Sequence, residues 1–367
     1  MDESSKKKTT AREALTTLDA RRICLIKPSA LGDVVQTLPL LPVLKERFPS
    51  AKISWVINRS LAELLRGHPA LDDVIEFDRH GTWSSWWNTL VELRDRRFDL
   101  VFDLQGLLRT AAMTFATRAP MCIGLESARE GAHLACHFTL PDTGLQVPAH
   151  RRYWRVAEAI GMESLRSTTT VAVSRPDYVH VSRQLQGLRR PLLAVHPGAR
   201  WVTKRWPVEK FAVLAAKAAR EFGFSVLILG SSDEQRIADQ LTQLLGRFVP
   251  HTPVRNLAGQ TSLKQLAAIL SRSDLLVTND SGPMHLAAGL GTSVVGVFTC
   301  TSPVRSGPPG DQHALVATHV SCAAAYRKRC PYQGSQHMAC MEELSVDRVW
   351  NALAVLMNRK IQDSKAA

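Results

Sequence analysis

A polar segment with residues suited to binding a phosphate, Asp280 to His285 (DSGPMH), lies between an apolar run and a helical pattern. Pro283 suits the first turn of a helix, and Gly282 allows a ligand to approach the backbone closely. Free N–H groups and the helix dipole would favour a phosphate there, whereas Asp280 would cap the helix or accept a hydrogen bond from a sugar hydroxyl. A plain capped helix with His285 in the core is the alternative.

Two further segments follow apolar runs and carry groups suited to a nucleotide. The loop His196 to Pro207 (HPGARWVTKRWP) combines cations with aromatic residues. Its Lys204 would neutralise charge on a leaving diphosphate, where the transition state most needs stabilisation, although a solvated basic loop explains the same pattern. After the next apolar run, Asp233 or Glu234 would bind ribose hydroxyls or simply form the acidic first turn of a helix.

Asp33 closes the segment Ser29 to Asp33 (SALGD), which again separates an apolar run from a helical pattern. The positive end of the helix dipole would keep this carboxylate ionised. An ionised carboxylate is the general base that an acceptor hydroxyl requires when it attacks an anomeric carbon. Because Asp is also a favoured N-cap residue, simple helix capping is the alternative.

Basic side chains gather in the same half of the chain, after the segment Gln105 to Arg109 (QGLLR). The further members are Arg118, Arg129, His150, Arg151 and Arg152. Arginines facing one crevice would hold a phosphorylated or carboxylated acceptor, because their forked donors match both groups, although each alone is an ordinary surface residue. The residues Trp83, Trp86 and Trp87 would stack on a sugar, touch a membrane interface or simply pack their helix.

Several familiar motifs are absent from the sequence. It has neither a P-loop nor a dinucleotide fingerprint, because the Gly-x-Gly at 289–291 follows a helical pattern and not a strand. It has no Asp-x-Asp triplet to hold a divalent cation on a sugar nucleotide. Cys322, Cys330, His337 and Cys340 could ligate zinc, but only the last two have a familiar ligand spacing, so we expect no metal.

Short apolar, β-branched runs alternate with helical patterns in both halves of the chain. We expect strands at 22–27, 52–57, 73–77, 99–103, 191–196, 225–230, 275–279 and 293–298. We expect helices at 34–48, 60–66, 83–96, 151–160, 208–222, 233–245, 263–271 and 283–290. Pro39 and Pro42 would kink or restart the first helix. The alternation predicts an α/β fold of two doubly wound, largely parallel domains with ligands at the carboxyl ends of the strands.

Length and charge set further bounds. A chain of 367 residues suits two domains. We expect a disordered polar arm at 1–20, domains at 21–180 and 181–350, and a helix end and tail at 351–367. The formal charge of +13 implies an anionic partner, which could be nucleic acid, a phosphorylated metabolite or an acidic membrane surface. The sequence shows no signal peptide or membrane-spanning run, which predicts a cytoplasmic protein, and its 7 cysteines predict reduced thiols.

Taken together, these segments resemble glycosyltransferase family nine, the ADP-heptose:lipopolysaccharide heptosyltransferases. The matching stretches are KPSALGDVVQTLPLL (27–41), DLVFDLQGLLRTA (99–111), SARE (127–130), HPGARWVTKRWP (196–207), NLAGQTSL (256–263) and NDSGPMHLAAGLGTSVVGVF (279–298), in family order. Ala199 and Arg200 stand where the first-transferase subfamily has hydroxyl residues, so the chain is more similar to the heptosyltransferase II-like branch. Cys322, Cys330 and Cys340 look like the cysteine-bearing C-terminal strip of that branch.

The resemblance implies a GT-B architecture, in which two Rossmann-like domains face each other across a cleft, the first binding the acceptor and the second the donor. Asp33 would be the base of an inverting displacement through an oxocarbenium-like state. The residues expected around the sugar-nucleotide donor are Arg200, Thr203, Lys204, Glu234, Asp280, Ser281, Gly282 and His285. Those expected around the acceptor are Ser29, Gly32, Gln105, Arg109, Arg129, His150 and Arg152. No metal or other cofactor is expected.

The acceptor implied by the resemblance is the phosphorylated, Kdo-bearing inner core of lipopolysaccharide, carried on lipid A. Its acidity would account for the basic charge and for peripheral contact with the cytoplasmic face of the inner membrane, with no nucleic acid as partner. Three alternatives stay open: a sugar-nucleotide epimerase on the same scaffold, a family-nine transferase with another donor, and a non-catalytic anion or nucleic-acid binding protein.

Overall fold

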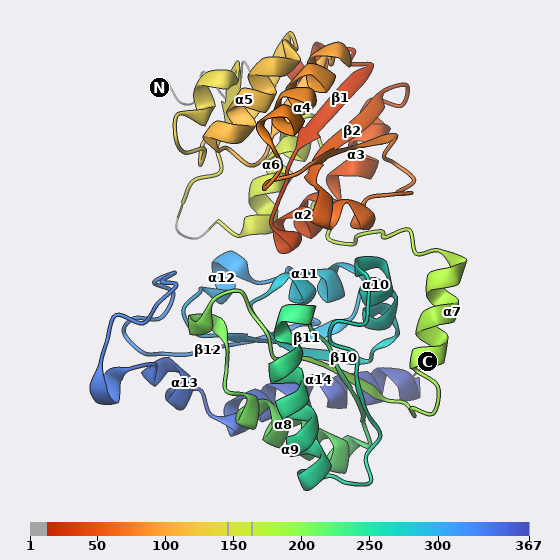
Figure 1. The fold of residues 1–367 in the computed structure, drawn as a ribbon, viewed down its shortest axis with the longest axis vertical. Coiled ribbons are helices and arrows are strands. Elements are labelled where there is room, and N and C mark those ends of the chain that lie inside the picture. The colour runs from red at the N-terminus through yellow and green to blue at the C-terminus, as the bar shows by residue number, and fades with distance from the viewer. Residues whose placement is uncertain (1–12, 145–146, 163, 367) are drawn as a thin grey trace. The chain divides into compact units, whose positions relative to one another are not determined.

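The computed structural model describes residues 13–144, 147–162 and 164–366, which form two compact units (Figure 1). Unit 1 is Met1–Ala172 and unit 2 is Val173–Ala367. The predicted boundary at 180/181 falls inside helix α7 (Arg175–Gln184), which belongs to unit 2. Among the described residues, no helix is both long and apolar enough to cross a membrane.

Unit 1 contains a parallel six-stranded sheet in the order β3-β2-β1-β4-β5-β6. Its strands are β1 (Arg22–Ile26), β2 (Lys52–Asn58), β3 (Asp73–Phe77), β4 (Leu100–Asp103), β5 (Met121–Leu125) and β6 (Phe138–Leu140). Its helices are α2 (Leu31–Thr37), α3 (Leu40–Arg47), η1 (Arg59–Leu64), α4 (Trp83–Asp95), α5 (Leu108–Thr117), η2 (Ala132–Ala135) and α6 (Ala149–Ala159). The helix predicted at 34–48 is therefore divided at Leu38 and Pro39, as the proline requires.

Unit 2 repeats this architecture with a second parallel sheet, ordered β12-β11-β10-β7-β8-β9. Its strands are β7 (Leu192–His196), β8 (Ser225–Ile228), β9 (Val254–Asn256), β10 (Leu275–Asn279), β11 (Ser293–Phe298) and β12 (Ala314–Ala317). After α7 come η3 (Val202–Lys204), α8 (Val208–Phe222), η4 (Ser232–Glu234), α9 (Gln235–Phe248), α10 (Leu263–Arg272), α11 (Gly282–Gly289), α12 (Pro303–Ser306), η5 (Gly334–Gln336), α13 (Ala339–Glu343) and α14 (Val346–Ala366).

In both sheets the order of the strands along the chain reverses at the central pair of strands. In unit 1 this happens between β1 and β4, where Ile26 pairs with Asp103, and in unit 2 between β7 and β10, where His196 pairs with Thr278. In an open parallel sheet, ligands bind outside the carboxyl ends of the strands at this switch point. The two α/β, Rossmann-like domains predicted from the sequence are thus present, and each has a defined place for a ligand.

The segment predicted as a disordered arm is partly ordered. Residues 13–17 form a helical turn, and Leu15 is fully buried. The Arg47 guanidinium donates to the carbonyl oxygens of Leu15, Thr16 and Leu18, so it satisfies the C-terminal end of this turn. The prediction overlooked the buried Leu15 and Ala20. Residues 1–12 lie outside the described part of the chain.

Candidate active site

Asp33 lies in the first turn of α2, just beyond the carboxyl end of β1. It is not the N-cap, because Ala30 holds that position. Its Oδ2 accepts the Ala30 N–H at 3.2 Å, and its Oδ1 accepts the Tyr153 hydroxyl at 2.9 Å. The side chain is still 37% exposed, so the carboxylate is held in direction while part of it faces solvent.

Lys27 supplies a buried positive charge beside this carboxylate. Its Nζ lies 3.7 Å from Asp33 Oδ2, donates to Gln105 Oε1 at 3.3 Å and lies 4.9 Å from the centre of the Tyr153 ring. Burial lowers the pKa of Lys27, and the nearby Asp33 carboxylate opposes that shift. Sequence reasoning missed Lys27, although a lysine that closes a buried strand directly before a proline is an unusual signal.

Tyr153 was also missed as a site residue. It lies on α6, which packs against α2, and is almost fully buried. Burial, reinforced by the adjacent Asp33, raises the pKa of Tyr153 well above its usual value. The phenol therefore keeps its proton and acts as a hydrogen-bond donor to Asp33.

The loop after β4 carries the predicted Gln105. Buried Asp103 accepts the N–H groups of both Gln105 and Gly106 at 3.0 Å, and burial raises the pKa of this carboxyl. Gly106 adopts φ +61°, and a Cβ there would lie 2.8 Å from Ala128 Cα, so glycine is required. Its carbonyl accepts the Arg129 N–H at 2.8 Å, which brings exposed Arg129 to the Gln105 loop.

The other predicted acceptor residues are more dispersed. Ser29 and Gly32 flank the start of α2 and are partly exposed. The Arg109 guanidinium lies 5.5 Å from the centre of the Phe77 ring, at the carboxyl end of β3. His150 and Arg152 lie in the first turn of α6, next to Tyr153. The structure thus gathers Lys27, Asp33, Gln105 and Tyr153 at the switch point of unit 1, with the predicted cations on the surrounding elements.

In unit 2, a histidine and a glutamate pair at the corresponding place. His196, the last residue of β7, has its Nε2 3.3 Å from Glu234 Oε2. Its Nδ1 shares hydrogen bonds with the hydroxyls of Ser281 at 3.3 Å and Thr278 at 3.4 Å. The predicted donor residues Glu234 and Ser281 are therefore joined through His196, whose role the sequence did not reveal.

Gly198 allows Glu234 to reach this position. A Cβ on Gly198 would lie 1.9 Å from Glu234 Oε1, so any larger residue must displace the carboxylate. Burial would raise the pKa of Glu234, but the hydrogen bond and charge of His196 and the hydrogen bonds from Ser231 outweigh it and lower the pKa to about 2. Glu234 is therefore an ionised acceptor, as a ribose diol would require.

Buried Asn279 fixes both ends of the basic loop predicted at 196–207. Its side-chain amide donates to the carbonyl oxygens of Pro197 at 2.8 Å and Gly198 at 3.3 Å. Its Oδ1 accepts the Trp206 N–H at 3.0 Å. Because a buried amide that loses such partners is costly, this residue holds the loop in one conformation.

Lys204 and Asp280 form a close ion pair within this site. Lys204 Nζ lies 2.6 Å from Asp280 Oδ2 and 4.8 Å from the centre of the Trp201 ring. The lysine side chain is 18% exposed and the aspartate 6%, so the ammonium is the more accessible partner. Asp280 precedes α11, whose N-terminus begins at Gly282 with Pro283 in its first turn. A cation and a helix N-terminus together form a suitable diphosphate site.

The remaining predicted donor residues differ in accessibility. Arg200 is exposed, and His285 is buried on α11. Thr203 is buried, and its hydroxyl donates to the Arg327 carbonyl at 2.7 Å and lies 3.4 Å from Cys300 Sγ. The structure therefore commits the Thr203 side chain to the protein interior and leaves Arg200 open to solvent.

The pairing of Glu234 with His196 makes the free energy of unfolding depend on pH. Because the pKa of Glu234 is about 2 when folded and its ordinary value is 4.5, its contribution is complete above pH 4.5 and is lost as the pH falls toward 2. We expect Glu234→Gln to lower the free energy of unfolding by roughly 1–2 kcal/mol at pH 6, with the difference vanishing near pH 2. Thermal unfolding of both proteins across this range measures the effect.

Two variants control this measurement. Gly198→Ala should reproduce the effect, because its Cβ forces Glu234 away from His196. Glu221→Gln, on the exposed side of α8, should show no such pH-dependent difference. A constant difference between Glu234→Gln and the parent at all pH values would contradict the assignment.

The cysteines near the C-terminus do not form a preassembled metal site. Cys322, Cys330 and Cys340 line a small cavity together with Cys300 and Thr203. The predicted fourth group, His337, instead has its Nδ1 3.0 Å from the Tyr332 carbonyl oxygen. Within the described residues, no three His, Cys, Asp or Glu side chains are placed to hold a metal ion.

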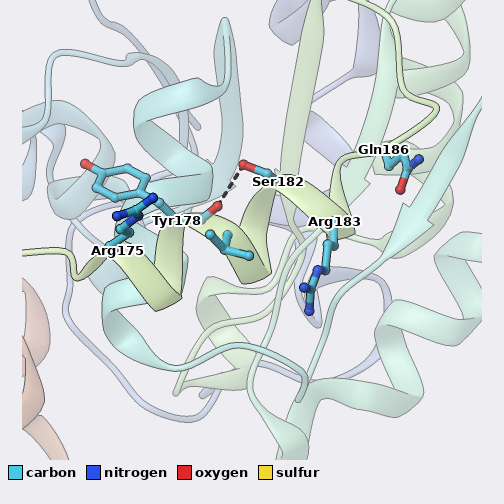
Figure 2. A pocket seen from close by; sticks show the side chains of 6 residues that line it. Arg175, Tyr178, Ser182, Arg183 and Gln186 are labelled. Carbon is cyan, nitrogen blue, oxygen red and sulfur yellow. Dashed lines mark hydrogen bonds between the residues drawn. The ribbon is translucent and has the colours of Figure 1, made fainter.

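A separate hollow of about 370 Å³ runs along α7 (Figure 2). Its lining residues are Arg175, Tyr178, Val179, Ser182, Arg183 and Gln186. The Ser182 hydroxyl donates to the Tyr178 carbonyl within the helix, at 2.7 Å. Because α7 and the turn after it supply the entire lining and none of the predicted site residues belongs to it, the switch points are the stronger candidate sites.

Two Rossmann-like domains, one with an oriented carboxylate and one with a cation beside a helix N-terminus, fit the class of sugar-nucleotide-dependent transferases. The family model for glycosyltransferase family 9 (heptosyltransferase) matches residues 86–336. The chain belongs to this family and is a glycosyltransferase.

Individual relatives agree with this assignment. Lipopolysaccharide heptosyltransferase 1 of Pseudomonas aeruginosa is 31% identical over 338 residues, covering 86% of this chain and 89% of the relative. Lipopolysaccharide core heptosyltransferase OpsX of Haemophilus influenzae is 27% identical over 303 residues, covering 82% and 85%. The solved structure of Escherichia coli ADP-heptose LPS heptosyltransferase II has a TM-score of 0.73 at 22% identity and covers 92% of this chain and 99% of that one, so the fold is shared.

Proposed function

We propose that this enzyme transfers heptose from ADP-heptose to the acidic inner core of lipopolysaccharide, in the cytoplasm. The relatives that support the reaction are a lipopolysaccharide core heptosyltransferase and a lipopolysaccharide heptosyltransferase 1. The donor is proposed from the similar fold of an ADP-heptose LPS heptosyltransferase. The observation that carries the proposal is Asp33, a partly exposed carboxylate that Ala30 and Tyr153 hold in one direction at the unit 1 switch point.

The proposed reaction inverts the anomeric carbon. An acceptor hydroxyl forms the new bond to this carbon while Asp33 removes its proton, and the bond to the diphosphate breaks with its electron pair leaving on ADP. Lys204 and the N-terminus of α11 stabilise the charge that develops on ADP, and Glu234 accepts hydrogen bonds from the ribose. Arg109, Arg129, His150 and Arg152 would bind the phosphate and carboxylate groups of the acceptor.

The reaction is proposed to need no metal ion. Lys204 would take the part that a divalent cation plays on the diphosphate of other sugar-nucleotide enzymes. Transfer in the presence of a chelator should therefore equal transfer in its absence. A loss of transfer that added Mg²⁺ restores would overturn this part of the proposal.

The direct test is incubation with ADP-heptose and with core acceptors that lack either the first or the second heptose. We expect ADP release together with a mass gain of one heptose on one of the acceptors, and the opposite anomeric configuration by NMR. Failure with both acceptors would refute the heptosyltransferase assignment. A donor that changes without any acceptor would indicate an epimerase, and transfer of another sugar would redefine the donor.

A further inference from the structure

Large apolar side chains are unusually exposed on one side of unit 1. Trp83 is 77% exposed, Phe115 is 78% exposed and Leu134 is 83% exposed. We use the name α4–α5 face for these residues together with Trp87, Val91 and Leu108, which are also exposed. Single exposed apolar residues are common, but a group of large ones marks an interaction surface.

The face is built from neighbouring elements. On α4, Trp83 and Trp87 are one helical turn apart and lie beside the stripe that contains Trp86 and Leu90, which pack on the core. α5 packs against α4 (Figure 1) and against η2, the element that carries Leu134. Because the core side of α4 already has its own apolar residues, the outer tryptophans are not needed to fold the helix.

Arginines outnumber carboxylates beside these apolar residues, where the exposed carboxylates are Glu92, Asp95 and Glu130. Arg79, Arg94 and Arg118 are exposed and lie within four residues of Trp83, Val91 and Phe115 respectively. The carboxylate of Glu92 on α4 is paired with Arg96 at 2.7 Å, which reduces its opposing charge. A surface of aromatic and aliphatic side chains with flanking arginines matches an anionic bilayer, where tryptophan favours the interface and arginine binds phosphate headgroups.

The position of the face also fits a lipid-borne acceptor. α4 and α5 begin after the carboxyl ends of β3 and β4, and Leu108 follows the Gln105 loop by three residues. The apolar residues at the start of both helices therefore border the edge of the sheet where Asp33 lies. We propose that the α4–α5 face docks the enzyme on an anionic lipid bilayer; this inference deepens the proposed function, whose acceptor is carried on a lipid.

Vesicle flotation tests the docking without any substrate. We expect the parent protein to float with vesicles of phosphatidylcholine and phosphatidylglycerol, and less with phosphatidylcholine alone or at high salt. The triple variant Trp83→Ser, Trp87→Ser, Phe115→Ser should partition roughly tenfold less. A variant of exposed apolar residues elsewhere, Val304→Ser with Val355→Ser, is the control and should float like the parent.

Kinetics on two forms of the acceptor separate docking from chemistry. We expect the triple variant to keep the parent's kcat/KM on a detergent-free, delipidated acceptor and to lose several-fold on an acceptor embedded in vesicles. Equal flotation of variant and parent would overturn the proposal, as would a parent dimer that only the triple variant loses, since the face would then bind a second copy. If no heptose is transferred at all, the proposed function fails while flotation still decides the docking.

Discussion

Asp33→Asn is expected to lower heptose transfer by about 10²–10⁴-fold while leaving the affinity for ADP-heptose nearly unchanged. Asparagine keeps the size of the side chain but cannot accept the proton of the attacking hydroxyl. Donor affinity should persist because the diphosphate and ribose groups are proposed to bind to Lys204 and Glu234, in unit 2. Rapid-quench kinetics and isothermal titration with ADP-heptose measure the two quantities.

Asp33→Asn should also lower the free energy of unfolding, because the buried Lys27 loses its charged partner. Thermal unfolding must therefore accompany the kinetics. Tyr153→Phe is the matched control, since it removes one hydrogen bond to the carboxylate and keeps its charge. We expect a loss of about tenfold or less in kcat for that variant. A value of kcat within about threefold of the parent for a folded Asp33→Asn protein would show that Asp33 only stabilises its helix.

Lys204→Met is expected to lower kcat/KM by about 10²–10³-fold and to weaken ADP binding as well. The lysine is the accessible cation of the proposed donor site, and its loss would leave the buried Asp280 carboxylate to repel the diphosphate. Steady-state kinetics with varied ADP-heptose and titration with ADP measure both effects.

Two further variants separate binding from folding. Lys204→Met leaves the Asp280 carboxylate unpaired, which should lower the free energy of unfolding. Adding Asp280→Asn removes this carboxylate, so the free energy of unfolding should return toward the parent value while transfer stays low. Lys217→Met provides a matched control, because Lys217 also lies over a tryptophan, Trp350, and near a carboxylate, but in a different part of unit 2. An unchanged KM and kcat for Lys204→Met would remove this lysine from the donor site.

Strong local patterns made much of the fold predictable. The helix at 208–222 and the strand at 275–279 were predicted to the residue, because one has a clear apolar stripe and the other a buried β-branched run. β12, an edge strand, was missed because its apolar run, ALVA, is only 4 residues long. α5 was missed because its threonines and alanines form only a weak helical pattern.

The candidate sites were predictable in position but not in their internal contacts. Polar residues after successive strands indicated the switch points, because parallel strands bring their carboxyl ends to one edge. The partner of Asp33, Tyr153, is 120 residues away in sequence. Its contact depends on how α6 packs on α2, which no local pattern encodes. His196 and Asn279 were missed because their contacts also join segments that are far apart in sequence.

The hydrogen bonds from Asn279 to both ends of the basic loop affect the entropy of donor binding. Because both ends of the loop at 196–207 are tied to one buried amide and Thr203 ties its middle to Arg327, the loop is already ordered before a nucleotide arrives. Binding then loses little backbone entropy, so most of the interaction enthalpy with the diphosphate is available as affinity. The proposed recognition of the donor by unit 2 would thus need little rearrangement of the protein.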